Sequence, residues 1–485
     1  MLIHLVGFEH DRSTDNLVRA FFPGAEVIPA DQRTPDGILT CQMEQSGSLV
    51  TFHVEARFPE LGESRCDWQA HAQEESERKQ KSKQAVYQTL RQLRGDLPWG
   101  TLVGVRPTKL LRDLEEKGCS REECGRQFRE EYLVSDQKTA LALDTYRNER
   151  EVLSRVRPDG ISAYVSIPFC PTRCRYCSFV SGALDAMRKY IPDYMRCLLR
   201  EIETRGKAIV QTGRPLQTVY IGGGTPTVLE PHDLRRLLHA VRTHLDFSQV
   251  QEFTVECGRP DTITPEKLAL LQEFGVDRIS INPQTMNDDT LERIGRRHTA
   301  EQIRQAFALA RSMGFDNINM DLIAGLDGEE PAHFRHTLEE VLALRPENIT
   351  LHTLAKKKGS DWSNEDKVQK NFTKHAGFSV EQMLSDAYNG FIGQGYEPYY
   401  MYRQKNMLGN FENVSYCRDG KFGLYNVVIM QEYHTIVAMG AGGVSKVVLP
   451  GIIRRRPNPK YPYEYIGRIE EILSALPAKE LSYDL

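Results

Sequence analysis

The chain has 485 residues, of which 40% are hydrophobic and 26% charged, and its formal net charge is −4. This length accommodates two to four domains with substantial cores, and the composition is that of a soluble globular protein. The weak negative charge excludes a global basic field for nucleic acid, and no apolar run reaches the length of a membrane span.

The N-terminus and the cysteines indicate the compartment. Residues 1–9 become charged too early for a secretory signal peptide. Ten cysteines are spread thinly over the chain, which is typical of a reducing compartment and one metal cluster rather than of a disulfide framework. We therefore expect a cytoplasmic protein.

Two segments precede the main domain. Residues 1–60 alternate short apolar runs with turns, which predicts a small strand-rich module. Residues 61–160 predict a mainly helical extension that includes a strongly polar stretch at 67–95. Its basic centre, 78–83, is expected to be solvated, with a ligand-facing surface as the alternative.

From residue 161 short β-rich runs alternate with amphipathic helical stretches. We expect strands at 162–168, 217–222, 251–256, 278–283, 317–324 and 348–354. We expect helices near 184–208, 231–245, 265–274, 300–313 and 331–344. This alternation predicts an α/β fold, with six parallel strands in a partial, TIM-like (β/α)6 barrel over 161–355 and helices outside. In such a fold the chemistry lies on loops after the carboxyl ends of the strands.

The remainder is expected to form a charged linker at 356–377 and a separate C-terminal α/β region at 378–485. Four tyrosines of that region are candidates for packing on a flat macrocycle or, alternatively, for a core cluster: Tyr396, Tyr399, Tyr400 and Tyr402. The glycines of segment 440–443 suggest a backbone turned tightly near a ligand, with a purely structural turn as the alternative.

Three cysteines follow the first strand of the predicted barrel. Cys170, Cys174 and Cys177 have the spacing C-x3-C-x2-C. Three thiolates on one short loop can hold three irons of a [4Fe–4S] cluster and leave the fourth iron open for chemistry. The alternative is a structural zinc site, but zinc takes four closed ligands, commonly as two separated pairs, and no partner pair stands nearby. The spacing favours the open cluster.

A glycine segment follows the second strand, with the residues Gly222, Gly223, Gly224, Thr225 and Pro226. Glycines let a ligand approach the backbone closely and leave amide and carbonyl groups available to meet it. The segment lacks the G-K-[ST] ending of a phosphate-binding P-loop and the G-x-G-x-x-G of a dinucleotide fold. A tight structural turn is the alternative.

The cysteine loop and the glycine segment together resemble the radical S-adenosylmethionine (SAM) enzymes. In that superfamily the open iron chelates the amino and carboxylate groups of SAM, and the glycine-rich segment receives the amino group. One electron from the cluster cleaves SAM, and the resulting radical abstracts hydrogen from the substrate. The resemblance therefore implies two cofactors, a [4Fe–4S] cluster and SAM.

A closer resemblance is to the oxygen-independent coproporphyrinogen III oxidase family, over about 160–355 and into 396–450. Four polar residues at or just beyond strand ends carry it, and in the family these positions contact SAM: Glu256, Gln284, Arg296 and Asp321. Carboxylate and amide groups can bind ribose hydroxyls, and arginine can pair with the SAM carboxylate. Tyr164 matches a family tyrosine near the cluster. The resemblance implies catalytic roles for Tyr164 and Arg296, although each polar residue alone has an ordinary structural interpretation.

Two neighbours of the cysteines depart from the decarboxylases of this family. Phe179 stands where those enzymes carry a further cysteine, and Ser166 where they carry a histidine. The C-x-F form also resembles heme chaperones of the family. With these departures and its long N-terminal extension, the chain most resembles the HemZ-type coproporphyrinogen dehydrogenases.

The resemblance implies oxidative decarboxylation of coproporphyrinogen III propionates to vinyl groups, giving protoporphyrinogen IX. Two alternatives stay open: a heme chaperone or trafficking protein, and a radical SAM enzyme that acts on heme itself. The implied partners are a tetrapyrrole, which residues 378–485 would cover, and a reductase or flavodoxin-type electron donor. Neither nucleic acid nor a membrane span is implied.

Overall fold

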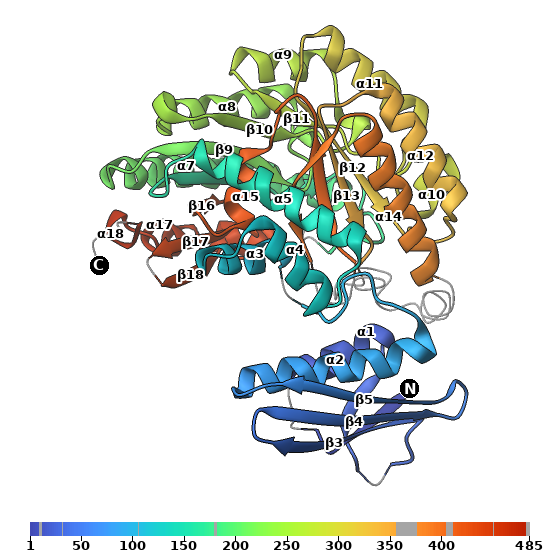
Figure 1. Ribbon diagram of the computed structural model, residues 1–485. Helices are drawn as coiled ribbons and strands as arrows, with labels where there is room; N and C mark the ends of the chain where they lie inside the picture. The colour runs from blue at the N-terminus through green and yellow to red at the C-terminus, as the bar shows by residue number, and fades with distance from the viewer. Residues whose placement is uncertain are drawn as a thin grey trace. The chain divides into compact units, whose positions relative to one another are not determined.

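The structure, a computed structural model, describes residues 1–8, 12–31, 33–104, 106–178, 182–355, 376–403, 411–449 and 451–481. The chain divides into two compact units, Met1–Tyr146 with Arg403–Glu412, and Arg147–Tyr402 with Asn413–Leu485 (Figure 1). Within the described residues, no helix combines the length and the apolar character that crossing a bilayer requires.

The N-terminal unit contains a five-stranded sheet in the order β2-β1-β3-β4-β5. Its strands are β1 (Leu2–Val6), β2 (Glu26–Pro29), β3 (Gly37–Ser46), β4 (Leu49–Phe58) and β5 (Gly62–His71). Helices α1 (Arg12–Phe21) and α2 (Glu75–Arg94) pack on one face (Figure 1). Along β4 alternate residues from Val50 to Ala56 are buried, as expected for a strand with one covered face. The sheet continues past residue 60, because β5 pairs with β4 along its whole length.

Three helices lead out of this sheet: α3 (Pro107–Glu116), α4 (Arg121–Glu130) and α5 (Asp136–Ser154). Pro107 stands in the first turn of α3, where its missing N–H costs no hydrogen bond. The helical character predicted for the later part of 61–160 is therefore present.

The second unit is built on an eleven-stranded sheet in the order β14-β15-β13-β12-β11-β10-β9-β6-β16-β17-β18. Its centre holds the six predicted parallel strands, β6 (Ile161–Ile167), β9 (Leu216–Gly223), β10 (Glu252–Glu256), β11 (Arg278–Ser280), β12 (Ile318–Ala324) and β13 (Asn348–Thr353). Five helices run between them and cover the outside of the sheet (Figure 1): α7 (Ile191–Gln211), α8 (Pro231–His244), α9 (Pro265–Glu273), α11 (Ala300–Ser312) and α12 (Pro331–Leu344). The predicted α/β alternation is confirmed. Within the described residues β14 and β18 remain edge strands, so the barrel is partial.

Two predicted elements differ from the observed ones by more than one residue at a boundary. The helix expected near 184–208 is interrupted: α6 (Leu184–Met187) and a 3-10 turn (Arg188–Tyr190) precede α7, which restarts with Pro192 in its first turn. The strand expected at 278–283 ends at Ser280. Pro283 follows soon after, and Gln284 has a left-handed backbone with a φ of 70°.

The C-terminal residues correct the expectation of a separate region. Strands β14 (Glu397–Tyr402) and β15 (Asn413–Cys417) join the sheet at β13, and β16 (Thr435–Met439), β17 (Val444–Leu449) and β18 (Ile452–Pro457) join at β6. An open parallel sheet leaves unpaired N–H and C=O groups at its edges, and these strands satisfy them on both sides. Most of the predicted linker 356–377 lies outside the described residues.

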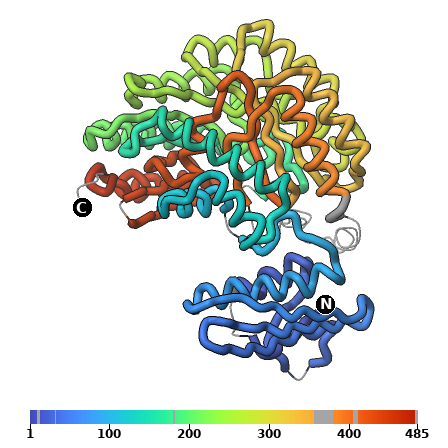
Figure 2. Tube along the Cα trace, viewed as in Figure 1, coloured from blue at the N-terminus to red at the C-terminus, as the bar shows by residue number. Residues whose placement is uncertain are grey.

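The remaining helices are α10 (Asp288–Arg293), α14 (Ala376–Gly393), α15 (Leu424–Met430), α16 (Pro462–Gly467), α17 (Ile469–Ser474) and α18 (Ala478–Leu481). The last three contact α7, and Figure 2 shows the end of the chain beside that helix. The C-terminal helices therefore pack on α7 rather than forming a further domain.

Candidate cluster and cofactor site

The cysteine loop begins where β6 ends. A two-residue strand β7 (Phe169–Cys170) pairs with β8 (Gly182–Ala183), and residues 171–178 after β7 form the described part of the loop. Within it the Cys177 N–H donates to the Cys174 carbonyl at 3.0 Å, which makes a tight turn. All three cysteines are half-buried reduced thiols.

The loop is anchored on two sides. The Thr172 hydroxyl donates to the Gly295 carbonyl at 2.8 Å, and the Arg175 N–H donates to the Ile294 carbonyl at 3.0 Å. On the other side the Thr225 N–H donates to the Phe169 carbonyl at 2.8 Å, and its hydroxyl lies 3.7 Å from the Cys170 sulfur. The loop is thus held against the glycine segment and against the chain that leads to Arg296.

The three cysteine thiols are donors of the kind that an iron–sulfur cluster takes. Among the described residues no three His, Cys, Asp or Glu side chains lie where they could hold one metal ion. A tetrahedral zinc needs its ligands to converge on one point. A [4Fe–4S] cluster takes each thiolate on a different iron, so its cysteines stand further apart. Thiolate is also the ligand such clusters use, so the residues fit the group.

The glycine segment packs too closely on the cysteine loop to carry side chains. A Cβ atom on Gly224 would lie 2.5 Å from the Phe169 carbonyl oxygen, and one on Gly223 would lie 2.9 Å from the Ser166 hydroxyl. Gly223 also has a φ of 108°, which only glycine adopts without strain. The carboxyl end of β9 therefore presents bare backbone beside the cysteines.

Glu256 is tied to this segment. Its carboxylate accepts a hydrogen bond from the Tyr220 hydroxyl at 2.5 Å and one from the Gly223 N–H at 3.1 Å. Burial raises the pKa of Glu256 to about 7; the Asp321 carboxylate adds to the rise, and the hydrogen bonds from Tyr220 and Gly223 oppose it. A carboxyl group with this pKa changes charge near neutral pH.

Ionisation of Glu256 is expected to cost stability in the cofactor-free protein. The folded protein loses this proton near pH 7, and the unfolded chain near 4.5. The contribution of the protonated carboxyl to folding stability is therefore intact below pH 4.5 and is lost as pH rises to 7. When the pH is raised from 5 to 8, the free energy of unfolding should fall by about 3 kcal/mol more in wild type than in Glu256→Gln. Denaturant titrations at the two pH values measure this. Parallel pH profiles for the two proteins would contradict it.

The other predicted residues lie at the neighbouring strand ends. The Gln284 N–H donates to the Asp321 carbonyl at 2.9 Å, which fixes the backbone after β11 against β12. The Asp321 side chain accepts from the Asn319 amide at 2.8 Å, and its second oxygen lies 3.9 Å from the His352 ring. Although burial opposes it, His352 lowers the pKa of Asp321, which favours the carboxylate.

Arg296 is a buried cation beside the cysteine loop. Its guanidinium donates to the Asn282 carbonyl and, at 3.2 Å, to the Tyr176 hydroxyl. Its Nε is buried and has no hydrogen-bond partner among the described residues. An unsatisfied buried donor on a cation is a place for an anionic ligand group. A carboxylate-bearing cofactor fits this side of the site.

Tyr164 belongs to a stack of three rings inside the sheet. Its ring centroid lies 6.0 Å from that of Tyr220 and 6.1 Å from that of Tyr425, and the latter two lie 4.5 Å apart. Tyr164 and Tyr220 are register partners on β6 and β9. The structure thus brings Tyr164, Tyr220 and Glu256 together below the glycine segment.

Several residues of the site were not predicted from the sequence. Arg259 lies 3.9 Å from the Cys174 sulfur and is paired with Asp261. His352 contacts Asp321 and accepts or donates a hydrogen bond with the Tyr402 hydroxyl at 3.2 Å. Only their positions near the carboxyl ends of strands could have indicated these residues, because Arg259 follows β10 and His352 is near the end of β13.

The C-terminal motifs are mainly structural. The four backbone N–H groups of Gly440, Ala441, Gly442 and Gly443 are bonded within the protein, to Glu201, the Tyr194 hydroxyl, Pro459 and Gly440 respectively. The backbone donors of this segment are therefore used within the protein, as the structural-turn alternative expects. Tyr396, Tyr399 and Tyr400 are buried, which fits the core interpretation, whereas Tyr402 is half-buried beside His352.

The two departures next to the cysteines have different outcomes. The Ser166 hydroxyl is buried and donates to the Ala441 carbonyl at 2.7 Å, and it also lies against Gly223 of the glycine segment. Phe179 lies outside the described residues.

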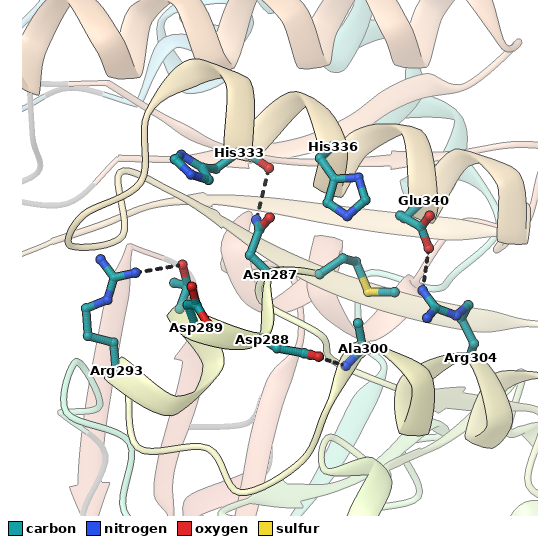
Figure 3. Close-up of a pocket in the computed structure, with 11 residues that line it drawn as sticks. Asn287, Asp288, Asp289, Arg293, Ala300, Arg304, His333, His336 and Glu340 are labelled. Atoms are coloured by element: carbon teal, nitrogen blue, oxygen red, sulfur yellow. Dashed lines mark hydrogen bonds and ion pairs between the residues drawn. The ribbon is translucent and has the colours of Figure 1, made fainter.

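A polar hollow of about 490 Å³ lies away from this site, between α10, α11 and α12 (Figure 3). Its side chains bind one another: Arg304 pairs with Glu340 at 2.6 Å, and the Asn287 amide donates to the His333 carbonyl at 3.0 Å. It contains none of the predicted site residues. The hollow lies beside α10. That helix precedes Ile294 and Gly295, whose carbonyls accept hydrogen bonds from the cysteine loop.

Comparisons with known proteins agree with this geometry. Residues 164–341 match the Radical SAM superfamily. The chain is 37% identical to the oxygen-independent coproporphyrinogen-III oxidase-like protein HemZ of Bacillus subtilis, over 97% of this chain and 96% of that one. It is 38% identical to the heme chaperone HemW of the same organism, over 40% of this chain and 50% of that one.

The fold is similar to that of the solved Escherichia coli coproporphyrinogen III oxidase HemN, a radical SAM enzyme, with a TM-score of 0.52 and 22% identity over 67% of this chain and 72% of that one. The radical SAM family uses a [4Fe–4S] cluster and SAM. The likeness to the HemZ protein covers almost the whole of both chains. The chain therefore belongs to the radical SAM superfamily, within the family of oxygen-independent coproporphyrinogen-III oxidase-like proteins.

Proposed function

We propose that the protein is a radical SAM enzyme that decarboxylates the propionate side chains of coproporphyrinogen III to vinyl groups. In each turnover a propionate would lose one hydrogen atom to the SAM-derived radical, one carbon dioxide, and one further electron to an external electron acceptor. The observation that carries the proposal is the cysteine loop packed on the bare glycine segment, in a chain similar to a HemZ protein over nearly its full length.

In this proposal Cys170, Cys174 and Cys177 hold the cluster. Gly222, Gly223, Gly224, Thr225, Glu256, Gln284, Arg296 and Asp321 hold SAM. When bound, these two groups supply one electron and a hydrogen-abstracting radical. Arg296 orients the SAM carboxylate through its Nε–H, and Glu256 and Asp321 accept from hydroxyl groups. Tyr164 forms part of the aromatic wall that keeps water from the reacting atoms.

The direct test is anaerobic incubation of the reduced, cluster-loaded protein with SAM and coproporphyrinogen III in the cytoplasmic pH range. We expect release of carbon dioxide and formation of protoporphyrinogen IX, with electrons from a reductase or flavodoxin-type donor. Cleavage of SAM without carbon dioxide would sink the decarboxylation and leave the superfamily assignment intact.

Two alternatives rest on specific observations. The likeness to HemW favours a heme chaperone, which would bind heme stably and transfer it to an apo-protein without turnover. The HemZ and HemN likenesses leave open radical chemistry on heme itself, with a linear tetrapyrrole as product. The same incubation with heme, analysed for binding and for products, separates the two.

The glycine segment offers a test of the SAM site that does not depend on the substrate. A methyl group on Gly224 would meet two carbonyl oxygens, at 2.5 and 2.9 Å, so Gly224→Ala must displace the backbone. We expect SAM affinity to fall about tenfold, since a strained backbone costs about 1–3 kcal/mol. Gly393→Ala is the control, because nothing lies within 4 Å of its added Cβ atom. Equal SAM affinity in both variants would contradict the assignment.

A further inference from the structure

Arg259 is a buried arginine with no part in the proposed SAM contacts. It follows β10 by three residues and is 3% exposed. Its Nη1 donates to the Thr172 hydroxyl at 3.1 Å and lies 3.5 Å from the Thr172 carbonyl oxygen. The same nitrogen lies 3.9 Å from the Cys174 sulfur. A full positive charge is therefore buried against one of the three cysteines of the loop.

The other two guanidinium nitrogens of Arg259 face a carboxylate. Its Nε and Nη2 atoms lie 3.2 and 3.4 Å from the two carboxylate oxygens of Asp261. Asp261 is shared, because the ring of the buried His298 lies 3.3 Å from it. Burial alone would raise the pKa of Asp261, but His298 and Arg259 lower it to about 2, so it is a carboxylate. Burial lowers the pKa of His298, so Arg259 is the cation of this group, and its Nη1 is the nitrogen that faces Cys174.

A neutral residue would suffice if the only task were to hold the loop, because a single donor can satisfy Thr172. Burying a guanidinium is costly unless the charge has a use or a full partner. A positive charge and a hydrogen bond at a cysteine sulfur both stabilise the more negative, reduced form of a cluster. Buried charges act strongly here because solvent does not screen them.

We propose that the positive charge of Arg259 raises the reduction potential of the cluster held by Cys170, Cys174 and Cys177. The Asp261 carboxylate partly offsets this effect. The step concerned is the uptake of one electron from the external donor by the oxidised cluster; no bond forms or breaks in it. Arg259 would thereby ease the reduction that precedes SAM cleavage. The inference rests on the proposed cluster site.

The test is a redox titration of the full-length, cluster-loaded protein without SAM, followed by electron paramagnetic resonance. In Arg259→Gln the charge is lost, and we expect the reduction equilibrium constant to fall at least tenfold, which lowers the midpoint potential by about 59 mV. Arg259→Lys keeps the charge and should show less than half that shift. Arg175→Gln removes an exposed charge from the same loop and should also shift less than Arg259→Gln.

Asp261→Asn should shift the midpoint potential of the cluster in the opposite direction. It leaves the guanidinium without its carboxylate, so the potential should rise. Damage to the loop would not move the two variants in opposite directions. The proposal is overturned if Arg259→Gln holds four irons and keeps the wild-type potential, or if both variants shift the same way. If Arg259→Gln takes up no iron, Asp261→Asn decides alone. Wild-type protein that assembles no [4Fe–4S] cluster would instead refute the proposed site.

Discussion

Replacing Cys174 by alanine is expected to abolish SAM cleavage. The loop would then offer two thiolates, and a cluster bound by two cysteines loses both its geometry and its single open iron. Because the radical chemistry depends entirely on that iron, we expect the rate of SAM cleavage to fall by about three orders of magnitude or more. Iron and sulfide content, measured together with 5′-deoxyadenosine formation, reports the effect. The same result is expected for Cys170 and Cys177.

Cys197→Ala is the matched control. Cys197 is a buried thiol on α7, and nothing places it in the cluster loop. Its loss should leave the iron content and SAM cleavage close to wild type. If Cys174→Ala kept a full cluster, or if Cys197→Ala lost it, the assignment of the three ligands would fail.

Replacing Arg296 by methionine is expected to weaken SAM binding about a hundredfold. Removal of one partner from a buried charge pair costs about 2–5 kcal/mol, and about 1.4 kcal/mol corresponds to tenfold in affinity. Methionine fills similar volume but has no donor for the SAM carboxylate. Equilibrium binding of SAM to the cluster-loaded protein measures the change, and iron content shows whether the cluster remains.

Arg297→Met is the control for Arg296, because Arg297 is the next residue in the chain and its side chain is exposed. Its affinity for SAM should remain within about twofold of wild type, as is usual for an exposed charge. Comparable losses in the two variants would show that the Arg296 effect is not specific to the buried guanidinium.

The local pattern of the sequence was sufficient for the centre of the fold. Each of the six parallel strands and five covering helices has its own apolar periodicity, so alternation alone predicts them. The partners of the C-terminal strands could not be predicted in this way. β15 pairs with β13, and β16 pairs with β6 at the other side of the sheet, and no local pattern encodes which edge a strand will take.

The site shows the same division. Cys170, the glycine segment and Glu256 follow strand ends, and parallel strands bring their carboxyl ends to one edge, so their proximity could be expected. Arg259 could not be found in this way, because it reaches back 85 residues to the Cys174 sulfur through an ordinary polar loop. His352 likewise appears as one more residue of a buried strand until Asp321 is placed opposite it.

The central claim is that Cys170, Cys174 and Cys177 hold a [4Fe–4S] cluster whose fourth iron binds SAM. It is tested most directly by spectroscopy of the reconstituted, reduced protein with and without isotopically labelled SAM. We predict four irons per chain, and a change at one unique iron when SAM is added, with magnetic coupling to the label on the SAM amino or carboxylate group. A cluster whose spectrum is the same with and without saturating SAM, or a mononuclear metal in its place, would contradict the account.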